Sequence, residues 1–139
     1  MSISVPVQDR RAGQRQKGEA LRVIVADDDR DILDTLSQIL RGAGHTVHPI
    51  NTGRDVLPAV RIVRPEAIIL DLAVPGMSGY AVAQEIRHTF VDVRRPLMIA
   101  ISGMWTGKSD RLIAQQVGFD HYLAKPFDPQ ELLRLLAAV

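Results

Sequence analysis

Five short apolar runs alternate along the chain with segments of helical periodicity. The runs occupy residues 21–26, 46–48, 67–71, 97–101 and 121–124. Short apolar runs that end at turn-forming or polar residues predict β-strands. Within the central runs, residues 23–26, 67–70 and 97–101 are all apolar, which is typical of strands buried on both sides in a parallel sheet.

The segments between the runs carry apolar residues three or four positions apart, which predicts amphipathic helices. The pattern is clearest over residues 32–40 and 132–136. The second of these follows Asp128 and Pro129, an N-cap residue and a proline at the first helical position. Weaker versions of the pattern occupy residues 56–63, 82–86 and 112–117.

Strict alternation of five strands with five helices implies a parallel sheet with helices on both faces. Right-handed crossovers leave few arrangements, and the common doubly wound order for five strands is 2-1-3-4-5. We therefore predict an α/β three-layer sandwich with a ligand crevice between the first and third strands. Pro49 confines the second strand, predicted at residues 46–48, to an edge of the sheet.

Polar side chains stand at the carboxyl ends of four of the predicted strands. They are Asp27 and Asp28 after the first strand, Asp71 after the third, Ser102 after the fourth and Lys125 after the fifth. Each alone has a simpler explanation, as a turn residue, an acid at a helix N-terminus or, for Lys125, a solvated charge at the end of a strand. The predicted strand order, however, brings all of them to one rim. Because Asp71 ends a buried strand, we expect it to be held rigidly and still to reach solvent.

The residue types at this rim point to phosphoryl chemistry. Clustered carboxylates repel one another unless a hard cation such as Mg²⁺ neutralises them, and two or three carboxylates with a backbone carbonyl suffice to bind it. A carboxylate beside Mg²⁺, an ammonium and a hydroxyl is equipped to attack a phosphoryl group and form an acyl phosphate. Binding of adenylates or dinucleotides is disfavoured, because the chain has no G-x-G-x-x-G or P-loop motif.

Four motifs, taken together, resemble the receiver domains of two-component response regulators. They are Val23–Asp29, Leu70–Gly79, Ile101–Gly103 and Tyr122–Phe127. They occur in order and at suitable spacing, and the resemblance covers about residues 21–139. It implies a flavodoxin-like (βα)5 fold in which Asp71 accepts a phosphoryl group from a histidine kinase or a histidine phosphotransfer protein.

The resemblance also implies the metal ligands. Asp28, Asp71 and the backbone carbonyl of Ala73 would bind Mg²⁺ (or Mn²⁺), with Asp27 assisting. Neither Ala73 nor Met104, two residues beyond the acceptor and the hydroxyl, can orient a water by a strong hydrogen bond. We therefore expect slow autodephosphorylation.

The remaining roles implied by the resemblance concern the response to phosphorylation. Lys125 would contact the phosphoryl oxygens, and Ser102, in place of the commoner threonine, would swing in to hydrogen-bond one of them. Tyr122 stands where the family has its switch aromatic, with plain core packing as the alternative. Trp105, the only tryptophan, lies in the loop before the fourth helix, where partner contact and loop packing are both open.

Composition sets outer limits on the function. A length of 139 residues suits one domain, and 46% hydrophobic with 24% charged residues is ordinary for a globular protein. The chain has no cysteine, which excludes disulfides, thiol catalysis and thiolate metal sites. No apolar run approaches the roughly 20 residues that span a bilayer, so we expect a cytoplasmic protein without membrane insertion.

Charge is unevenly spread along the chain. Residues 1–22 hold five basic and two acidic residues, whereas residues 23–139 hold twelve basic and fourteen acidic ones. Residues 23–139 are therefore mildly acidic and lack the basic charge pattern that is typical of direct nucleic-acid binding. Residues 1–19 have no apolar periodicity and predict a disordered basic tail ahead of a receiver domain at 20–139.

These features predict a phosphorylation-controlled interaction module rather than a turnover enzyme. With no residues after the last helix, we expect a stand-alone receiver that switches a surface toward an unidentified downstream protein; the resemblance allows a homodimer through the face of the fourth and fifth helices. Two alternatives stay open. A phosphate-independent scaffold would need no Mg²⁺. A haloacid-dehalogenase-like phosphohydrolase is less favoured, because it carries Asp-x-Asp where this chain has Ala73.

Overall fold

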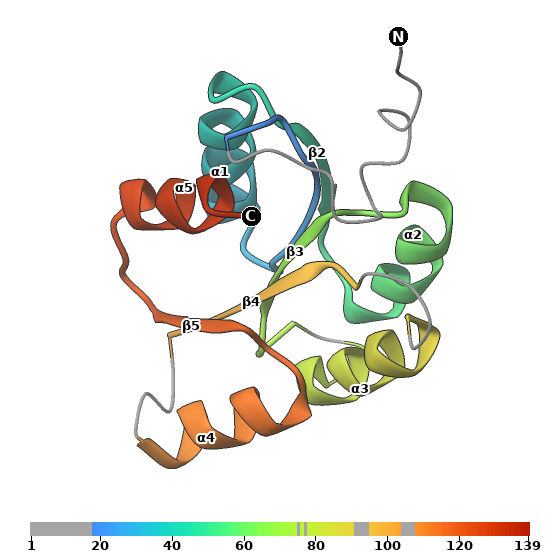
Figure 1. The fold of residues 1–139 in the computed structure, drawn as a ribbon. Helices are drawn as coiled ribbons and strands as arrows, with labels where there is room; N and C mark the ends of the chain where they lie inside the picture. The colour runs from blue at the N-terminus through green and yellow to red at the C-terminus, as the bar shows by residue number, and fades with distance from the viewer. Residues whose placement is uncertain (1–17, 75, 77, 91–94, 104–107) are drawn as a thin grey trace, which may run out of the picture.

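A computed structural model of the chain describes residues 18–74, 76, 78–90, 95–103 and 108–139. Its five strands are β1 (Arg22–Ala26), β2 (Thr46–Ile50), β3 (Ala67–Asp71), β4 (Leu97–Ser102) and β5 (His121–Ala124). All neighbouring strands pair in parallel in the order β2-β1-β3-β4-β5 (Figure 1). The predicted strand order and the doubly wound α/β class are confirmed.

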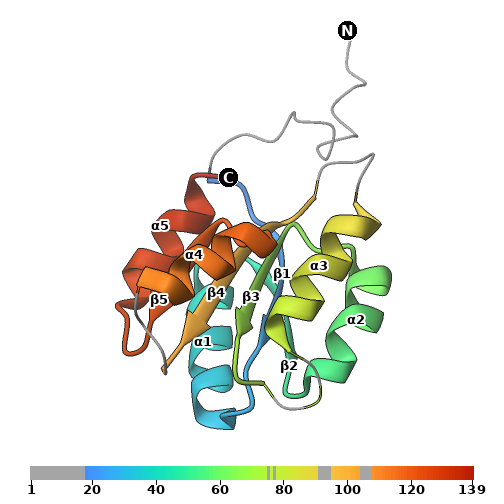
Figure 2. The ribbon, with the colours of Figure 1, turned by 90° about the horizontal axis from the view of Figure 1, so that it is seen from below.

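The helices complete a three-layer arrangement. They are α1 (Arg30–Gly42), α2 (Val56–Val63), α3 (Gly79–Thr89), α4 (Lys108–Val117) and α5 (Pro129–Ala137), with a short 3-10 helix, η3 (Gly53–Asp55), before α2. Helices α1 and α5 cover one face of the sheet, and α2, α3 and α4 cover the other (Figures 1 and 2). No helix among the described residues is both long enough and apolar enough to span a bilayer.

Strand β2 departs from its predicted length. It was expected over residues 46–48 but extends to Ile50, with Pro49 lying opposite Val25 of β1. An edge strand is paired on one side only, so a proline without an N–H is tolerated within it. The edge position is confirmed, and the predicted end is wrong by two residues.

Side-chain caps define where three of the helices begin. Asp29, Ser78 and Asp128 accept backbone N–H groups from the first turns of α1, α3 and α5. These N–H groups have no carbonyl partner within their own helix, so each cap satisfies a donor that would otherwise be open. Pro129 occupies the first turn of α5, as predicted. The cap of α1 also fixes the turn that follows β1.

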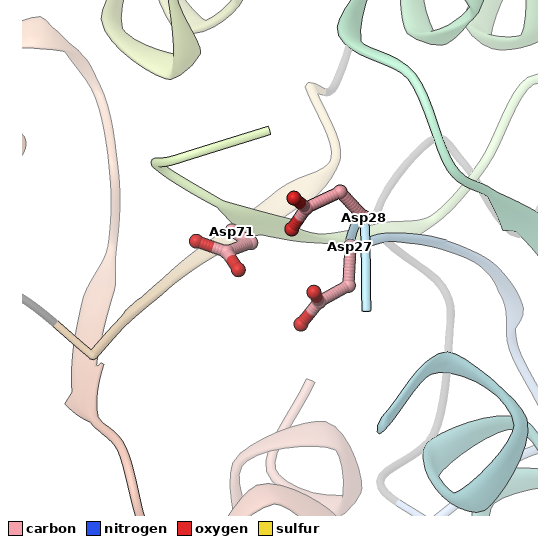
Figure 3. Close-up of side chains that lie close together, drawn as sticks. All are labelled: Asp27, Asp28 and Asp71. Atoms are coloured by element: carbon pink, nitrogen blue, oxygen red, sulfur yellow. The ribbon is translucent and has the colours of Figure 1, made fainter. Parts of the chain in front are cut away.

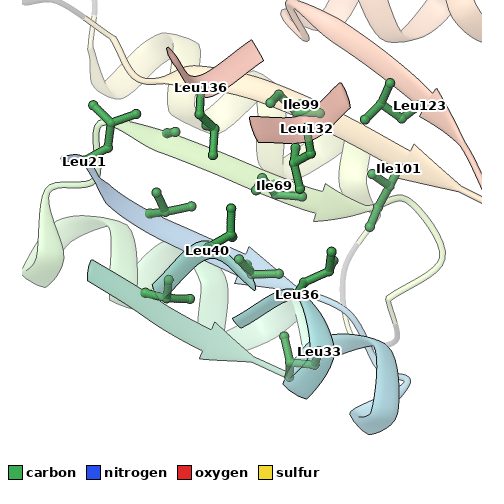
Figure 4. Packing of buried hydrophobic residues seen from close by; sticks show 14 residues of the cluster. Leu21, Leu33, Leu36, Leu40, Ile69, Ile99, Ile101, Leu123, Leu132 and Leu136 are labelled. Carbon is green, nitrogen blue, oxygen red and sulfur yellow. The ribbon is translucent and has the colours of Figure 1, made fainter. Parts of the chain in front are cut away.

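The sheet is buried on both faces, which explains its uninterrupted apolar runs. Ile69 of β3 packs with leucines of α1 and α5 (Figure 4), whereas its neighbours Ile68 and Leu70 pack toward α2, α3 and α4. Each of the two isoleucines is fully buried, and burying such a side chain contributes roughly 2 kcal/mol. The sheet is therefore a firm base for residues at the carboxyl ends of its strands.

The first and last parts of the described chain lie side by side. The N–H of Gly18 donates to the carbonyl of Ala137 at 3.0 Å, and Figure 2 places the C-terminus beside the start of β1. The predicted disordered tail, residues 1–19, falls outside the described residues except for its last two. The boundary near residue 20 stays a prediction.

Candidate functional site

Three aspartates meet at the carboxyl rim of the sheet. Asp27 and Asp28 directly follow β1, and Asp71 ends the adjacent strand β3, so the parallel register places them together. One carboxylate oxygen from each lies within 4.8 Å of the others, and Figure 3 shows the three side chains at the ends of the two strands. The structure thus brings together the acidic residues that the sequence singled out.

The three carboxylates differ in their access to solvent. Asp27 is fully buried, Asp28 is exposed, and Asp71 is only 3% exposed. The expectation that Asp71 reaches solvent is therefore wrong, because the side chain of Lys125 lies against its carboxylate.

Lys125 bridges the two buried carboxylates. Its Nζ donates to Oδ2 of Asp71 at 2.7 Å and to Oδ2 of Asp27 at 2.9 Å. Its backbone N–H also donates to the carbonyl of Ser102 at 2.8 Å, which fixes the end of β5 to the end of β4. The ammonium therefore stands between the ends of β1 and β3, although it comes from the far edge of the sheet.

Backbone N–H groups hold the other oxygens of these carboxylates. The N–H of Asp29 donates to Oδ1 of Asp27, and the N–H of Ala73 donates to Oδ1 of Asp71, both at 2.9 Å. Neither contact was predicted from the sequence. The signal was present, because aspartate commonly accepts the N–H two residues further on in a turn.

Burial and charge act against each other at this rim. Burial raises the pKa of Asp27, and the charge of Asp71 raises it further, although the N–H of Asp29 and the Lys125 ammonium act in the opposite direction. For Lys125, burial alone would lower the pKa, but its hydrogen bonds to Asp71 and Asp27 and the negative charges of these carboxylates together outweigh burial and raise it. Lys125 is therefore charged at neutral pH, with more carboxylates than ammonium groups around it.

Ser102 and Tyr122 lie on β4 and β5, the two strands beyond β3 in the sheet. Ser102 ends β4 and is 5% exposed. Tyr122 is a half-buried residue of β5 that packs toward α2, α3 and α4, which agrees with core packing and leaves its switch role a prediction. Met104 and Trp105 lie outside the described residues, so the expectations for them stay predictions.

The donor set at this rim fits a hard divalent cation. Carboxylate oxygens are preferred ligands of Mg²⁺, and bonds of about 2.1 Å place opposite ligands about 4.2 Å apart. One carboxylate oxygen each of Asp27, Asp28 and Asp71 lies within 4.8 Å of the other two, so the three carboxylates are close enough to face one ion. A cation would also offset the surplus of negative charge that Lys125 leaves.

The chain is similar to known proteins both in sequence and in structure. The family model described as the response regulator receiver domain matches residues 23–137. The DNA-binding response regulator MtrA of Mycolicibacterium paratuberculosis is 36% identical over 120 residues, which cover 84% of this chain and 50% of that protein. The chain thus spans about half the length of the curated relatives it matches.

Solved structures show the same architecture. The chemotaxis response regulator CheY4 of Vibrio cholerae superposes with a TM-score of 0.75 at 26% identity, over 85% of this chain and 97% of that one. The BeF3-activated DrrB receiver domain gives a TM-score of 0.74 at 27% identity, over 84% of this chain and 94% of that one. Both agree with the fold described above.

Proposed function

The chain belongs to the receiver domain family of two-component response regulators, and on this premise we propose that Asp71 accepts the phosphoryl group. The bridge from Lys125 to Asp71 inside a cluster of three carboxylates carries this proposal. Asp27 is fully buried, and Asp28 is exposed without a hydrogen bond to Lys125. Asp71 is held in place by the N–H of Ala73 and contacts the Lys125 ammonium.

In the proposed reaction, a carboxylate oxygen of Asp71 attacks the phosphorus of a phosphohistidine on a histidine kinase or a histidine phosphotransfer protein. The new O–P bond forms as the P–N bond breaks, and the imidazole leaves with its electron pair. Lys125 then exchanges its hydrogen bond to Asp71 for one to a phosphoryl oxygen. The hydroxyl of Ser102 donates to another phosphoryl oxygen, since Ser102 ends β4 and Lys125 directly follows β5 at this rim.

Asp27, Asp28, Asp71 and the carbonyl of Ala73 would hold Mg²⁺ or Mn²⁺. When bound, this ion neutralises negative charge on the transferring phosphoryl oxygens. The buried position of Asp27 and Asp71 supports this role, because charges act more strongly where water is excluded. Ala73 supplies no side-chain group to orient water, which supports a long-lived phosphorylated form.

Phosphorylation would act by shifting an equilibrium between two arrangements of the domain. The surface that changes would involve Ser102, Tyr122, α4 and α5, and it would bind a downstream protein. Pairing of two copies through the face of α4 and α5 is compatible with this role. In this proposal the domain signals and does not turn over a substrate.

Intact mass after incubation with acetyl phosphate and Mg²⁺ tests the proposal. We expect the wild type to gain about 80 Da, the gain to disappear with EDTA, and Asp71→Ala to show no gain. Asp55→Ala, which changes an exposed aspartate of η3, is the matched control and should gain mass as the wild type does. A gain in Asp71→Ala would mean that another residue is the acceptor. No gain in the wild type, with acetyl phosphate or with a phosphorylated histidine donor, would favour the scaffold alternative.

A further inference from the structure

An exposed arginine lies against Tyr122. The Cζ of Arg111, in the first turns of α4, is 5.6 Å from the centroid of the Tyr122 ring. A guanidinium within about 6 Å of an aromatic centroid is attracted to the face of the ring. Among the described residues, no hydrogen bond or ion pair involves the Arg111 side chain, so the ring is the contact that gives this guanidinium its place.

The other surroundings of Tyr122 come from the core and from α3. Tyr122 and Tyr80 of α3 pack against the same group of buried residues under α2, α3 and α4. Burial raises the pKa of Tyr80, and the charges of Tyr122 and of Asp110 on α4 raise it further, which agrees with a close approach of all three. The Tyr122 ring therefore has the core on one side and Arg111 on another, and a change of its position breaks the contact with Arg111.

Tyr122 is linked to the acidic rim through its own strand. It lies opposite Ala100 in the parallel register, and two residues further on Ser102 lies opposite Ala124. Lys125 follows directly after Ala124. A shift of Ser102 or Lys125 toward a phosphoryl group thus acts on the same two strands that position the Tyr122 ring.

We propose that Arg111 is a positioning residue that holds Tyr122 in the arrangement belonging to the unmodified Asp71 and so opposes phosphorylation. This inference rests on the proposed function of Asp71 and Tyr122. In the structure both oxygens of Asp71 accept hydrogen bonds from protein groups, Oδ1 from the N–H of Ala73 and Oδ2 from Lys125. This is the arrangement expected for an unphosphorylated carboxylate. A contact that stabilises this arrangement alone lowers the population of the competent one, and its removal raises the affinity for a phosphoryl group.

The test is the dissociation constant of beryllofluoride, a phosphoryl mimic, measured by titration in Mg²⁺ with the fluorescence of the single tryptophan. We expect Arg111→Gln to bind beryllofluoride about two- to fivefold more tightly than the wild type, which is the scale of an exposed cation–π contact. Arg111→Lys keeps the cation and should stay close to the wild type. Arg61→Gln, an exposed arginine of α2, is the matched control and should change nothing.

A double-mutant cycle shows whether the effect passes through the ring. In a Tyr122→Leu background, Arg111→Gln should have no further effect on beryllofluoride affinity. An unchanged or weaker affinity for Arg111→Gln, or an equal gain without the ring, would overturn the inference while the proposed function stands. A folded wild type that binds no beryllofluoride would overturn the proposed function, and the inference with it. A lower melting temperature with unchanged affinity would reveal a merely structural role.

Discussion

The two rims of the sheet both carry charged side chains, but they balance those charges differently. At the amino rim, Arg22 donates through Nε and Nη2 to the carbonyl of Arg64, at 3.1 and 2.9 Å, and its Nη1 lies 3.5 Å from Glu66. Arg95, which precedes β4, pairs with Asp120 at 2.9 Å. There each guanidinium has its own carboxylate, and both arginine side chains are partly exposed to solvent, at 39% and 40%.

At the carboxyl rim the balance is lost. Three carboxylates, two of them buried, lie together there, and the Lys125 ammonium pairs with the two buried ones. Burying unbalanced charge costs stability, so a fold keeps it where function needs it. The comparison teaches that a buried excess of charge of one sign indicates a functional site, whereas the presence of charged residues alone does not.

Removal of the Lys125 ammonium should have the largest effect. We expect Lys125→Met to lower the free energy of unfolding by about 3 kcal/mol without Mg²⁺, because Asp27 and Asp71 are then buried without a cation. Urea denaturation measures this loss, and the intact mass should show no phosphorylation. A stability equal to the wild type would mean that the carboxyl rim is no more dependent on its cation than the amino rim.

Addition of Mg²⁺ should restore the missing balance. At a concentration 100 times its dissociation constant, Mg²⁺ should raise the free energy of unfolding by about 2.7 kcal/mol, and EDTA should reverse the gain. Asp28→Asn should reduce the gain, as it removes one of the ligands. Sodium chloride at equal ionic strength is the control, since simple screening would raise stability with either salt.

Acidification should relieve the strain at Asp27. Its pKa is raised, so the folded state takes up a proton at a higher pH than the unfolded chain does. Without Mg²⁺, the wild type should therefore gain stability relative to Asp27→Asn as the pH falls through the raised pKa, by at most about 1.4 kcal/mol per pH unit. Parallel pH curves for the two proteins in denaturant titrations would show that Asp27 carries no such strain.

A change at the amino rim should have the smallest effect. Arg22 is 39% exposed in its side chain, and we expect Arg22→Gln to lower the free energy of unfolding by about 0.5–1 kcal/mol. Its gain of mass with acetyl phosphate should equal that of the wild type. Loss of phosphorylation in Arg22→Gln would show that the two rims are coupled.

The sequence predicted the fold because both the sheet and its rim follow from periodicity. Apolar runs such as 67–71 mark strands buried on two faces, and a parallel order brings their carboxyl ends together. The burial of Asp71 could not be predicted in this way. It depends on Lys125, 54 residues away in the chain, and on the path of a long side chain across the rim.

Contacts between elements were also beyond the sequence pattern. Arg111 reads as one more exposed helical residue, and its place over Tyr122 depends on how α4 packs beside β5. The end of β2 was missed for a different reason, since Pro49 breaks most strands but not one at an edge. Periodicity predicts the helices and strands and which strand ends meet at one rim. Side-chain contacts between elements follow only from the packed structure.

The hydrogen bond between Gly18 and Ala137 holds the two ends of the described chain close enough to be joined. Because α5 runs back along the sheet, both residues lie at the amino rim, away from the acidic cluster (Figure 2). A short linker from residue 139 to residue 18 would join the two ends, so that a circular permutant opened elsewhere in the chain would keep its carboxyl rim unchanged. A reporter fused at either residue would leave from that same rim and keep clear of the aspartates.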